Sequence, residues 1–157
     1  MRALFAALLL STAALPVRPI GDARKLVAEL GHGKPLVLHF WATWCVACRT
    51  EFPRLRAGLL ALPGRGVEVA LVTIDRPEDR EKAEEMLRHF HLATLPALLL
   101  DAPSPDPVAQ VVGEPKWDGT LPATFVFDAH GKLAHSFIGV TDPAKLDAEV
   151  RKISRRE

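Results

Sequence analysis

The order of apolar and amphipathic segments in this sequence predicts an α/β domain with one central mixed sheet and helices on both faces. Two runs, Leu36–Trp41 and 67–74, are mostly apolar, which is typical of strands covered on both faces. Helix-like segments alternate with these runs, so the two strands are expected to be parallel. Later in the chain, Ala123–Phe127 and 132–138 flank a turn that ends in Gly131, a pattern that predicts an antiparallel hairpin.

Four helices are predicted around this sheet. The first spans about 22–30, and the second spans about 46–62, where Pro53 is expected to kink it. The third runs from about 77 to 91 and has acidic residues in its first turn. The last begins at Asp142-Pro143, where the aspartate can cap it and the proline suits its first turn.

The segments after the third helix are predicted to be a short strand at 97–100 and a loop at 101–107. The loop is expected because three prolines fall within it. No domain-scale linker or internal repeat interrupts the sequence, and 157 residues suffice for one domain with a proper core.

The charge of the chain argues against nucleic acid as a partner. Lys and Arg total 20 and Asp and Glu total 19, so the net charge is +1. The basic residues form no stripe interleaved with aromatic side chains, the pattern that nucleic-acid binding requires.

The first residues have the pattern of an export signal. Arg2 precedes an apolar stretch at 3–10, and small residues follow at 11–14. We therefore expect a signal peptide at 1–15, cut after Ala13 or Ala14, and a domain at 16–157 in the periplasm or another extracytoplasmic space. The alternative is an uncleaved anchor, but the apolar run ends well short of the roughly 20 residues of a membrane-spanning helix.

The two cysteines of the chain, Cys45 and Cys48, form a C-x-x-C pair between a predicted strand and a predicted helix. A helix N-terminus favours a thiolate, so this position predicts a dithiol that opens and closes. The alternative is a structural disulfide. So short a loop would constrain the unfolded chain by only about 2 kcal/mol, which favours the redox-active interpretation.

The segment from Phe40 to Cys48 (FWATWCVAC) resembles the active-site segment of the TlpA/ResA branch of exported thioredoxin-like oxidoreductases. Pro53 matches the helix-kinking proline of that family, and Leu121-Pro122 with the strand after it resembles the family's cis-proline strand. The resemblance implies a thioredoxin-like fold with an inserted helix–strand segment at 76–100. It also implies thiol–disulfide oxidoreductase activity.

Five matched residues receive roles from this resemblance. Cys45 is expected to be the exposed attacking thiol, and Cys48 the buried resolving thiol. A cis peptide bond at Pro122 would place the Leu121 backbone beside Cys45, where a substrate strand can pair with it; the alternative is an ordinary trans turn. Trp44 is expected to cover the dithiol, and its alternative role is core filling.

Glu51 and His39 are the remaining candidate catalytic residues. Glu51 stands where ResA-like proteins carry an active-site glutamate, which would shuttle protons or adjust the thiol pKa values. Its alternative role is to complement the helix dipole in the first turn. His39 stands where this branch often has Asn, and a buried imidazole there would relay a proton to or from Cys48. Its alternative is a core histidine bonded to backbone. The pair Val46-Ala47 also departs from the family, because many relatives have proline before the second cysteine.

The resemblance predicts an exported reductant of protein disulfides, which acts in cytochrome c maturation or copper-site assembly. A membrane electron-donor thiol protein would re-reduce it, and the protein is expected to be a monomer without cofactor or bound metal. The reductive direction comes from the family alone, so an oxidase or isomerase stays open. Two other functions are alternatives. One is a Sco-like copper chaperone, although that family has three residues between its cysteines and this chain has two. The other is a peroxiredoxin-like peroxidase, although the arrangement of Pro and Thr that precedes the reactive cysteine of that family is absent here.

Overall fold

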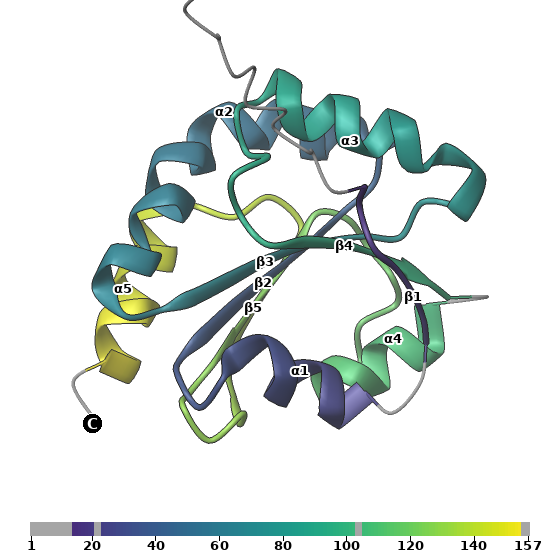
Figure 1. Ribbon diagram of the computed structural model, residues 1–157. Helices are drawn as coiled ribbons and strands as arrows, with labels where there is room; N and C mark the ends of the chain where they lie inside the picture. Colours follow the sequence, from purple (N-terminus) through teal and green to yellow (C-terminus); the bar gives the residue numbers. More distant parts are fainter. Residues whose placement is uncertain (1–13, 21–22, 103–104, 155–157) are drawn as a thin grey trace, which may run out of the picture.

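The computed structural model describes residues 14–20, 23–102 and 105–154 (Figure 1). Most of the predicted signal peptide therefore lies outside the described residues. Among the residues described, no helix is both long enough and apolar enough to cross a membrane.

A single six-stranded mixed sheet forms the centre of the domain, with the strand order β1-β4-β3-β2-β5-β6. The first four strands in this order, β1, β4, β3 and β2, are parallel to one another, whereas β5 runs antiparallel to β2 and to β6. The predicted parallel strands and closing hairpin are thus confirmed. The strands are β1 Val17–Pro19, β2 Leu36–Trp41, β3 Glu68–Thr73, β4 Ala97–Asp101, β5 Ala123–Phe127 and β6 Leu133–Ile138.

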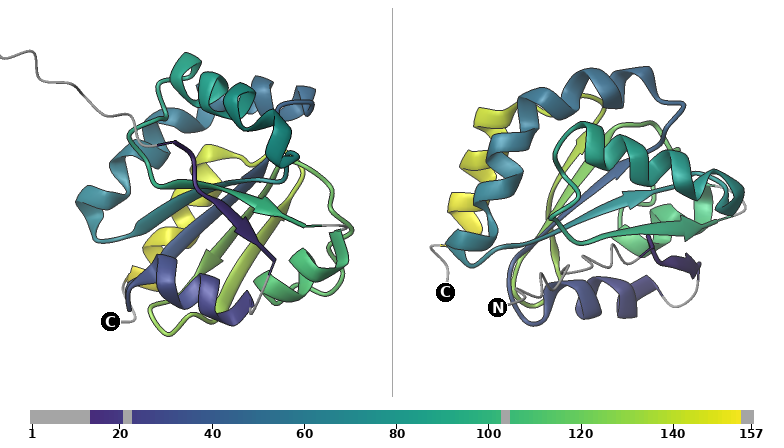
Figure 2. Two further views of the ribbon diagram at one scale, coloured as in Figure 1. Left: turned by 45° about the vertical axis from the view of Figure 1, so that its right-hand side comes forward. Right: turned by 45° about the horizontal axis from the view of Figure 1, so that its top comes forward.

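Helices cover both faces of this sheet, as the sequence predicts. Figures 1 and 2 show α2, α3 and α5 over one face and α1 and α4 over the other. The helices are α1 Ala23–Gly31, α2 Val46–Ala61, α3 Arg80–His89, α4 Pro105–Val112 and α5 Pro143–Ser154. Short 3-10 turns lie at Pro63–Arg65 and Pro77–Asp79. The helix predicted at 77–91 is therefore a 3-10 turn followed by α3.

The core consists of two apolar clusters, one on each side of the sheet. Neighbouring residues of β2 alternate between them: Trp41 packs in the cluster under α2 and α5, and Phe40 in the cluster under α1 and α4. Phe52 meets Trp41 edge-on, with ring centroids 5.3 Å apart. Both faces of β2 are buried, which explains why five of its six residues are apolar and alternate positions carry no solvent-facing polar side chain.

Two elements differ from the expectation. The loop predicted at 101–107 is wrong from Pro105 on, because α4 begins there. Proline is tolerated in a first helical turn, where the backbone N–H needs no intrahelical partner, so Pro105 and Pro107 begin this helix rather than prevent it. Strand β1 was not predicted. Its three side chains are all exposed, so no apolar pattern marks it.

Candidate active site

Cys45 and Cys48 form a disulfide where β2 gives way to α2, with their Cα atoms 5.3 Å apart. Cys45 is the N-cap residue of α2, and its Sγ accepts a hydrogen bond of 3.1 Å from the Cys48 backbone N–H. In the reduced protein the same N–H group and the helix N-terminus favour a thiolate at Cys45. The local structure therefore suits the first cysteine as the nucleophile.

The two cysteines differ in exposure, although less than predicted. Cys45 is 7% exposed and Cys48 is fully buried. The expectation of an openly exposed Cys45 is thus wrong for the disulfide form. Cys45 is nevertheless the one cysteine of the pair that solvent reaches.

Trp44 and Val46 flank Cys45 and are both largely exposed, at 64% and 66%. Core filling by Trp44 is therefore wrong. That Trp44 covers the dithiol stays a prediction. An exposed apolar rim beside a reactive sulfur is suited to contact with another polypeptide.

The Leu121–Pro122 peptide bond is cis, as predicted, and the trans alternative is wrong. The next residue, Ala123, begins β5 and is paired with Phe40 of β2. This pairing brings the cis bond to the end of the sheet where β2 leads to Cys45. The Pro122 carbonyl accepts a hydrogen bond from Gly139 N–H at 2.9 Å, which ties this bend to the segment after β6.

Asp75 anchors the loop before Cys45, a role that the sequence did not predict. Its buried carboxylate accepts hydrogen bonds from the Thr43 backbone N–H at 2.9 Å and from the Thr43 hydroxyl at 2.7 Å. The Thr73 hydroxyl donates to it at 2.6 Å. A buried carboxylate with three donors holds its loop in one conformation. Its one sequence signal is its position just after a buried strand.

Glu51 is buried beneath the dithiol and is 1% exposed. One of its oxygens, Oε1, accepts a hydrogen bond from the Thr141 backbone N–H. Burial raises the pKa of this carboxyl to about 7, against the opposing effects of Thr141 and the Arg54 charge. The alternative role, an acid that complements the helix dipole in the first turn, is wrong because Glu51 lies beyond the first turn of α2. A carboxyl that titrates near neutral pH is suited to proton transfer.

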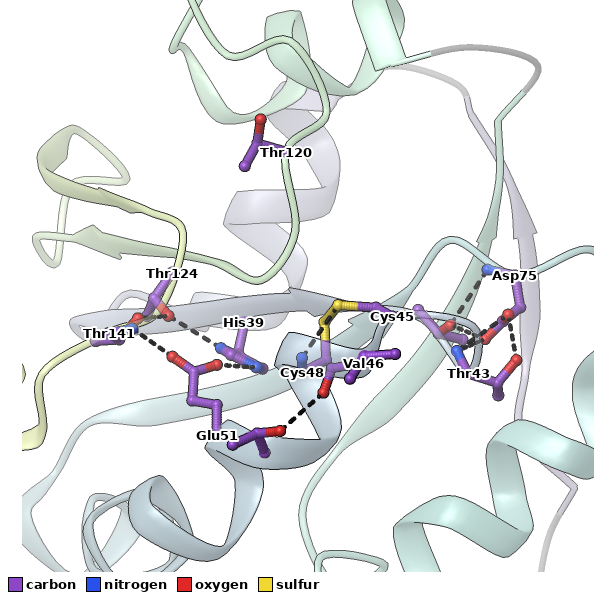
Figure 3. Close-up of a disulfide and its surroundings, with 12 residues drawn as sticks. His39, Thr43, Cys45, Val46, Cys48, Glu51, Asp75, Thr120, Thr124 and Thr141 are labelled. Carbon is purple, nitrogen blue, oxygen red and sulfur yellow. Dashed lines mark hydrogen bonds and ion pairs between the residues drawn. A yellow bond between two sulfur atoms is a disulfide. The ribbon is translucent and has the colours of Figure 1, made fainter.

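His39 lies on β2 and is also fully buried. Its Nδ1 is 2.9 Å from the Thr124 hydroxyl, and its Nε2 is 3.5 Å from Glu51 Oε2. The alternative of a histidine bonded to backbone is wrong, because these neighbours are side chains. Burial lowers the pKa of His39 to about 4, so the imidazole is neutral at pH 7. Figure 3 shows the ring between the Glu51 carboxyl and the disulfide.

The copper-binding alternative requires a third ligand beside the two cysteines. Within residues 14–20, 23–102 and 105–154, no three or more His, Cys, Asp or Glu side chains gather in a group suited to a metal ion. The structure thus adds no observation in favour of that alternative.

Residues 20–136 match the model of the AhpC/TSA family. This chain belongs to the AhpC/TSA family. It is 26% identical over 133 residues to a thiol-disulfide oxidoreductase ResA of Bacillus cereus, and the match covers 85% of this chain and 71% of ResA. It is 30% identical over 131 residues to the thiol:disulfide interchange protein DsbE of Pseudomonas fluorescens biotype C, and that match covers 78% of this chain and 61% of DsbE.

Solved structures of DsbF-type proteins have a fold similar to this one. A DsbF homologue from Corynebacterium diphtheriae has a TM-score of 0.66 at 21% identity, and the match covers 80% of this chain and 75% of that homologue. MTB DsbF has a TM-score of 0.60 at 26% identity, with 80% and 84% covered. The predicted thioredoxin-like fold and the resemblance to ResA-type proteins are confirmed. With the Cys45–Cys48 pair, these relatives also confirm the enzyme class, a thiol–disulfide oxidoreductase.

Proposed function

We propose that this protein reduces disulfides of other proteins outside the cytoplasm, with Cys45 as the attacking thiol and Cys48 as the resolving thiol. The observation that carries the proposal is the disulfide at the start of α2, where the Cys48 N–H points at Cys45 Sγ. The kinship with ResA and DsbE proteins supports the same chemistry.

The reaction requires two exchanges between sulfur atoms. The Cys45 thiolate attacks one sulfur of the substrate disulfide, which forms a mixed disulfide and releases the first substrate thiolate. The Cys48 thiol loses its proton, and its sulfur attacks Cys45 Sγ and releases the second substrate thiolate. The substrate gains two electrons, and the enzyme is left with the Cys45–Cys48 disulfide of this structure.

The residues around the dithiol would bind the substrate and transfer protons. An extended substrate segment would hydrogen-bond to the Leu121 backbone at the cis Pro122, while Trp44 offers an exposed apolar contact. Glu51 and His39 would serve as the acid–base groups of the dithiol. Both are buried, the Glu51 carboxyl can gain or lose a proton near neutral pH, and the His39 imidazole is neutral there.

The setting of this activity follows from the sequence. The segment 1–15 would act as an export signal and leave a monomeric domain outside the cytoplasm. Its substrates would be oxidised cysteine pairs of apocytochrome c or of copper-site assembly proteins. A thiol protein of the membrane would return electrons to the disulfide.

The reduction potential of the Cys45–Cys48 pair tests the proposed direction. We expect a value of about −270 mV, that of a reductant, when the protein is equilibrated with thiol buffers of known potential. A value near about −120 mV would identify an oxidant and overturn the proposal. A Cys48→Ala variant should also form a stable mixed disulfide with an oxidised peptide through Cys45, whereas a Cys45→Ala control should form none.

A further inference from the structure

Four buried polar side chains meet under the dithiol from four parts of the chain. His39 lies on β2, Glu51 on α2 and Thr124 on β5, while Thr141 lies just before α5 (Figure 3). Each is at most 1% exposed. Buried polar groups require hydrogen-bond partners, so the pairing within this set determines the protonation states that it can hold.

The contacts of the four residues close into a ring. His39 Nδ1 is 2.9 Å from Thr124 Oγ1, which is 2.8 Å from Thr141 Oγ1. The Thr141 backbone N–H donates to Glu51 Oε1, and the Thr141 side chain lies beside the same carboxyl, whose pKa it lowers. Two atoms have no other hydrogen-bond partner, His39 Nε2 and Glu51 Oε2, and they lie 3.5 Å from each other. Each is therefore the partner that the other needs.

The ring can be satisfied in two opposite directions. With Glu51 protonated, its O–H donates to His39 Nε2, Nδ1–H donates to Thr124, Thr124 donates to Thr141, and Thr141 donates back to Glu51. With Glu51 ionised, His39 carries its hydrogen on Nε2 and donates to the carboxylate. The Thr124 hydroxyl then donates to Nδ1, and the Thr141 hydroxyl donates to Thr124.

We propose that His39, Glu51, Thr124 and Thr141 form a hydrogen-bonded ring that reverses direction when Glu51 gains or loses its proton, which switches His39 between its two neutral tautomers. In both directions every donor hydrogen of the ring has an acceptor. The Glu51 carboxyl can therefore gain or lose a proton while every buried polar group of the ring keeps a hydrogen-bond partner. Thr124 and Thr141 are positioning residues in this scheme, since they act through His39 and Glu51.

The use of this ring rests on the proposed function. Glu51 follows Cys48 by three residues on α2, so both occupy one side of the helix. When Cys48 attacks Cys45, its thiol proton would pass to Glu51. When a donor thiolate attacks Cys45 during re-reduction, Cys48 leaves as a thiolate and would take the proton back. The ring would reverse once in each direction per catalytic cycle.

The charges around the ring are compatible with this exchange. Glu51 has a pKa of about 7, and the pKa of His39 is about 4, so the carboxyl and not the imidazole changes charge near neutral pH. Arg54 on α2 favours the ionised carboxylate. Asp142, next to Thr141, is exposed and accepts the Lys145 N–H at the start of α5.

The tautomer of His39 tests the proposal directly, in the disulfide form and without any substrate. The protein is labelled with ¹⁵N-histidine and ¹³C-glutamate, and the His39 nitrogen shifts and the Glu51 carboxyl shift are followed by NMR from pH 5 to pH 9. We expect the hydrogen on Nδ1 at low pH and on Nε2 at high pH, with one shared midpoint. A His39 tautomer that stays fixed while Glu51 titrates would overturn the proposal.

Variants at Thr124 separate the ring from simple packing. Thr124→Val removes the acceptor of Nδ1–H, so His39 is expected to keep its hydrogen on Nε2 at every pH. Thr124→Ser keeps the hydroxyl and should restore the switch. Thr50→Val, which removes an exposed hydroxyl on α2, is the matched control and should leave the switch unchanged. A Thr124→Val protein that switches like the wild type contradicts the ring. Failure of the reductase assay alone contradicts only the proposed function.

Discussion

The backbone N–H of Cys48 and the Sγ of Cys45 are joined by a 3.1 Å hydrogen bond. The first cysteine is therefore the N-cap of α2, and its sulfur lies at the positive end of the helix dipole. The second cysteine has no exposed surface. In the reduced protein, this position would favour a thiolate at Cys45, whereas Cys48 lies buried one helical turn further along α2.

Glu51 should make the folded protein less stable as the pH rises toward neutrality. Its pKa rises from 4.5 to about 7 on folding, so the folded state holds a proton that the unfolded state has lost. Glu51 therefore lowers stability as pH rises from about 4.5 to about 7, by about 3 kcal/mol in all. In a His39→Asn variant, where His39 no longer titrates, urea denaturation should show this fall. A flat profile would contradict the burial effect.

His39 should contribute the opposite slope. Its pKa falls from 6.5 to about 4 on folding, so the unfolded state binds a proton that the folded state does not. Stability due to His39 is fully present above about pH 6.5 and is lost as pH falls toward 4. A Glu51→Gln variant should show this loss alone in urea denaturation, whereas in the wild type the two slopes offset each other between about pH 4.5 and 6.5.

Asp75→Asn should destabilise the loop that carries the dithiol. The amide replaces one acceptor oxygen by a donor that faces the Thr43 and Thr73 donors, so buried groups lose their partner. We expect a loss of about 1–3 kcal/mol in the free energy of unfolding. Asp118→Asn is the control, because Asp118 makes a similar turn with Thr120 in solvent. Equal effects of the two substitutions would count against the anchoring role.

Truncation of Trp41 should lower the stability of the protein strongly, whereas truncation of Trp44 should change it very little. Trp41 is fully buried, so Trp41→Ala is expected to cost about 3–5 kcal/mol of stability. Trp44 is 64% exposed, so Trp44→Ala should change stability by less than about 0.5 kcal/mol. It should nevertheless slow the reduction of a protein disulfide more than that of a small disulfide. Equal slowing for both substrates would show that Trp44 does not contact protein substrates.

Prediction from the sequence was strongest where local pattern determines structure. The buried strand Leu36–Trp41 has the predicted bounds because both of its faces are covered. The Cys45 cap and the cis Pro122 agree with the motifs that predicted them. By contrast, β1 pairs through its backbone while its side chains face solvent, and α4 begins with prolines that also suit a loop.

The polar partners of the site could not be predicted, because the chain brings them together from far apart. Thr124 is 85 positions from His39, and Thr141 is 90 positions from Glu51. Asp75 is 32 positions from Thr43. Threonines and a single aspartate carry no motif in a sequence. The contacts follow from three features of the fold: the pairing of β2 with β5, the pairing of β2 with β3, and the packing of α2 against the segment before α5.

Differential alkylation of the reduced protein tests the central claim most directly. Iodoacetamide is applied across a pH series, and modification at each cysteine is followed by mass spectrometry. We expect Cys45 to react at neutral pH faster than free cysteine, with a midpoint below the usual thiol pKa of about 8.5, while Cys48 stays protected. If Cys45 reacts no faster than free cysteine and Cys48 is modified equally, the account of an activated first thiol and a buried second thiol is contradicted.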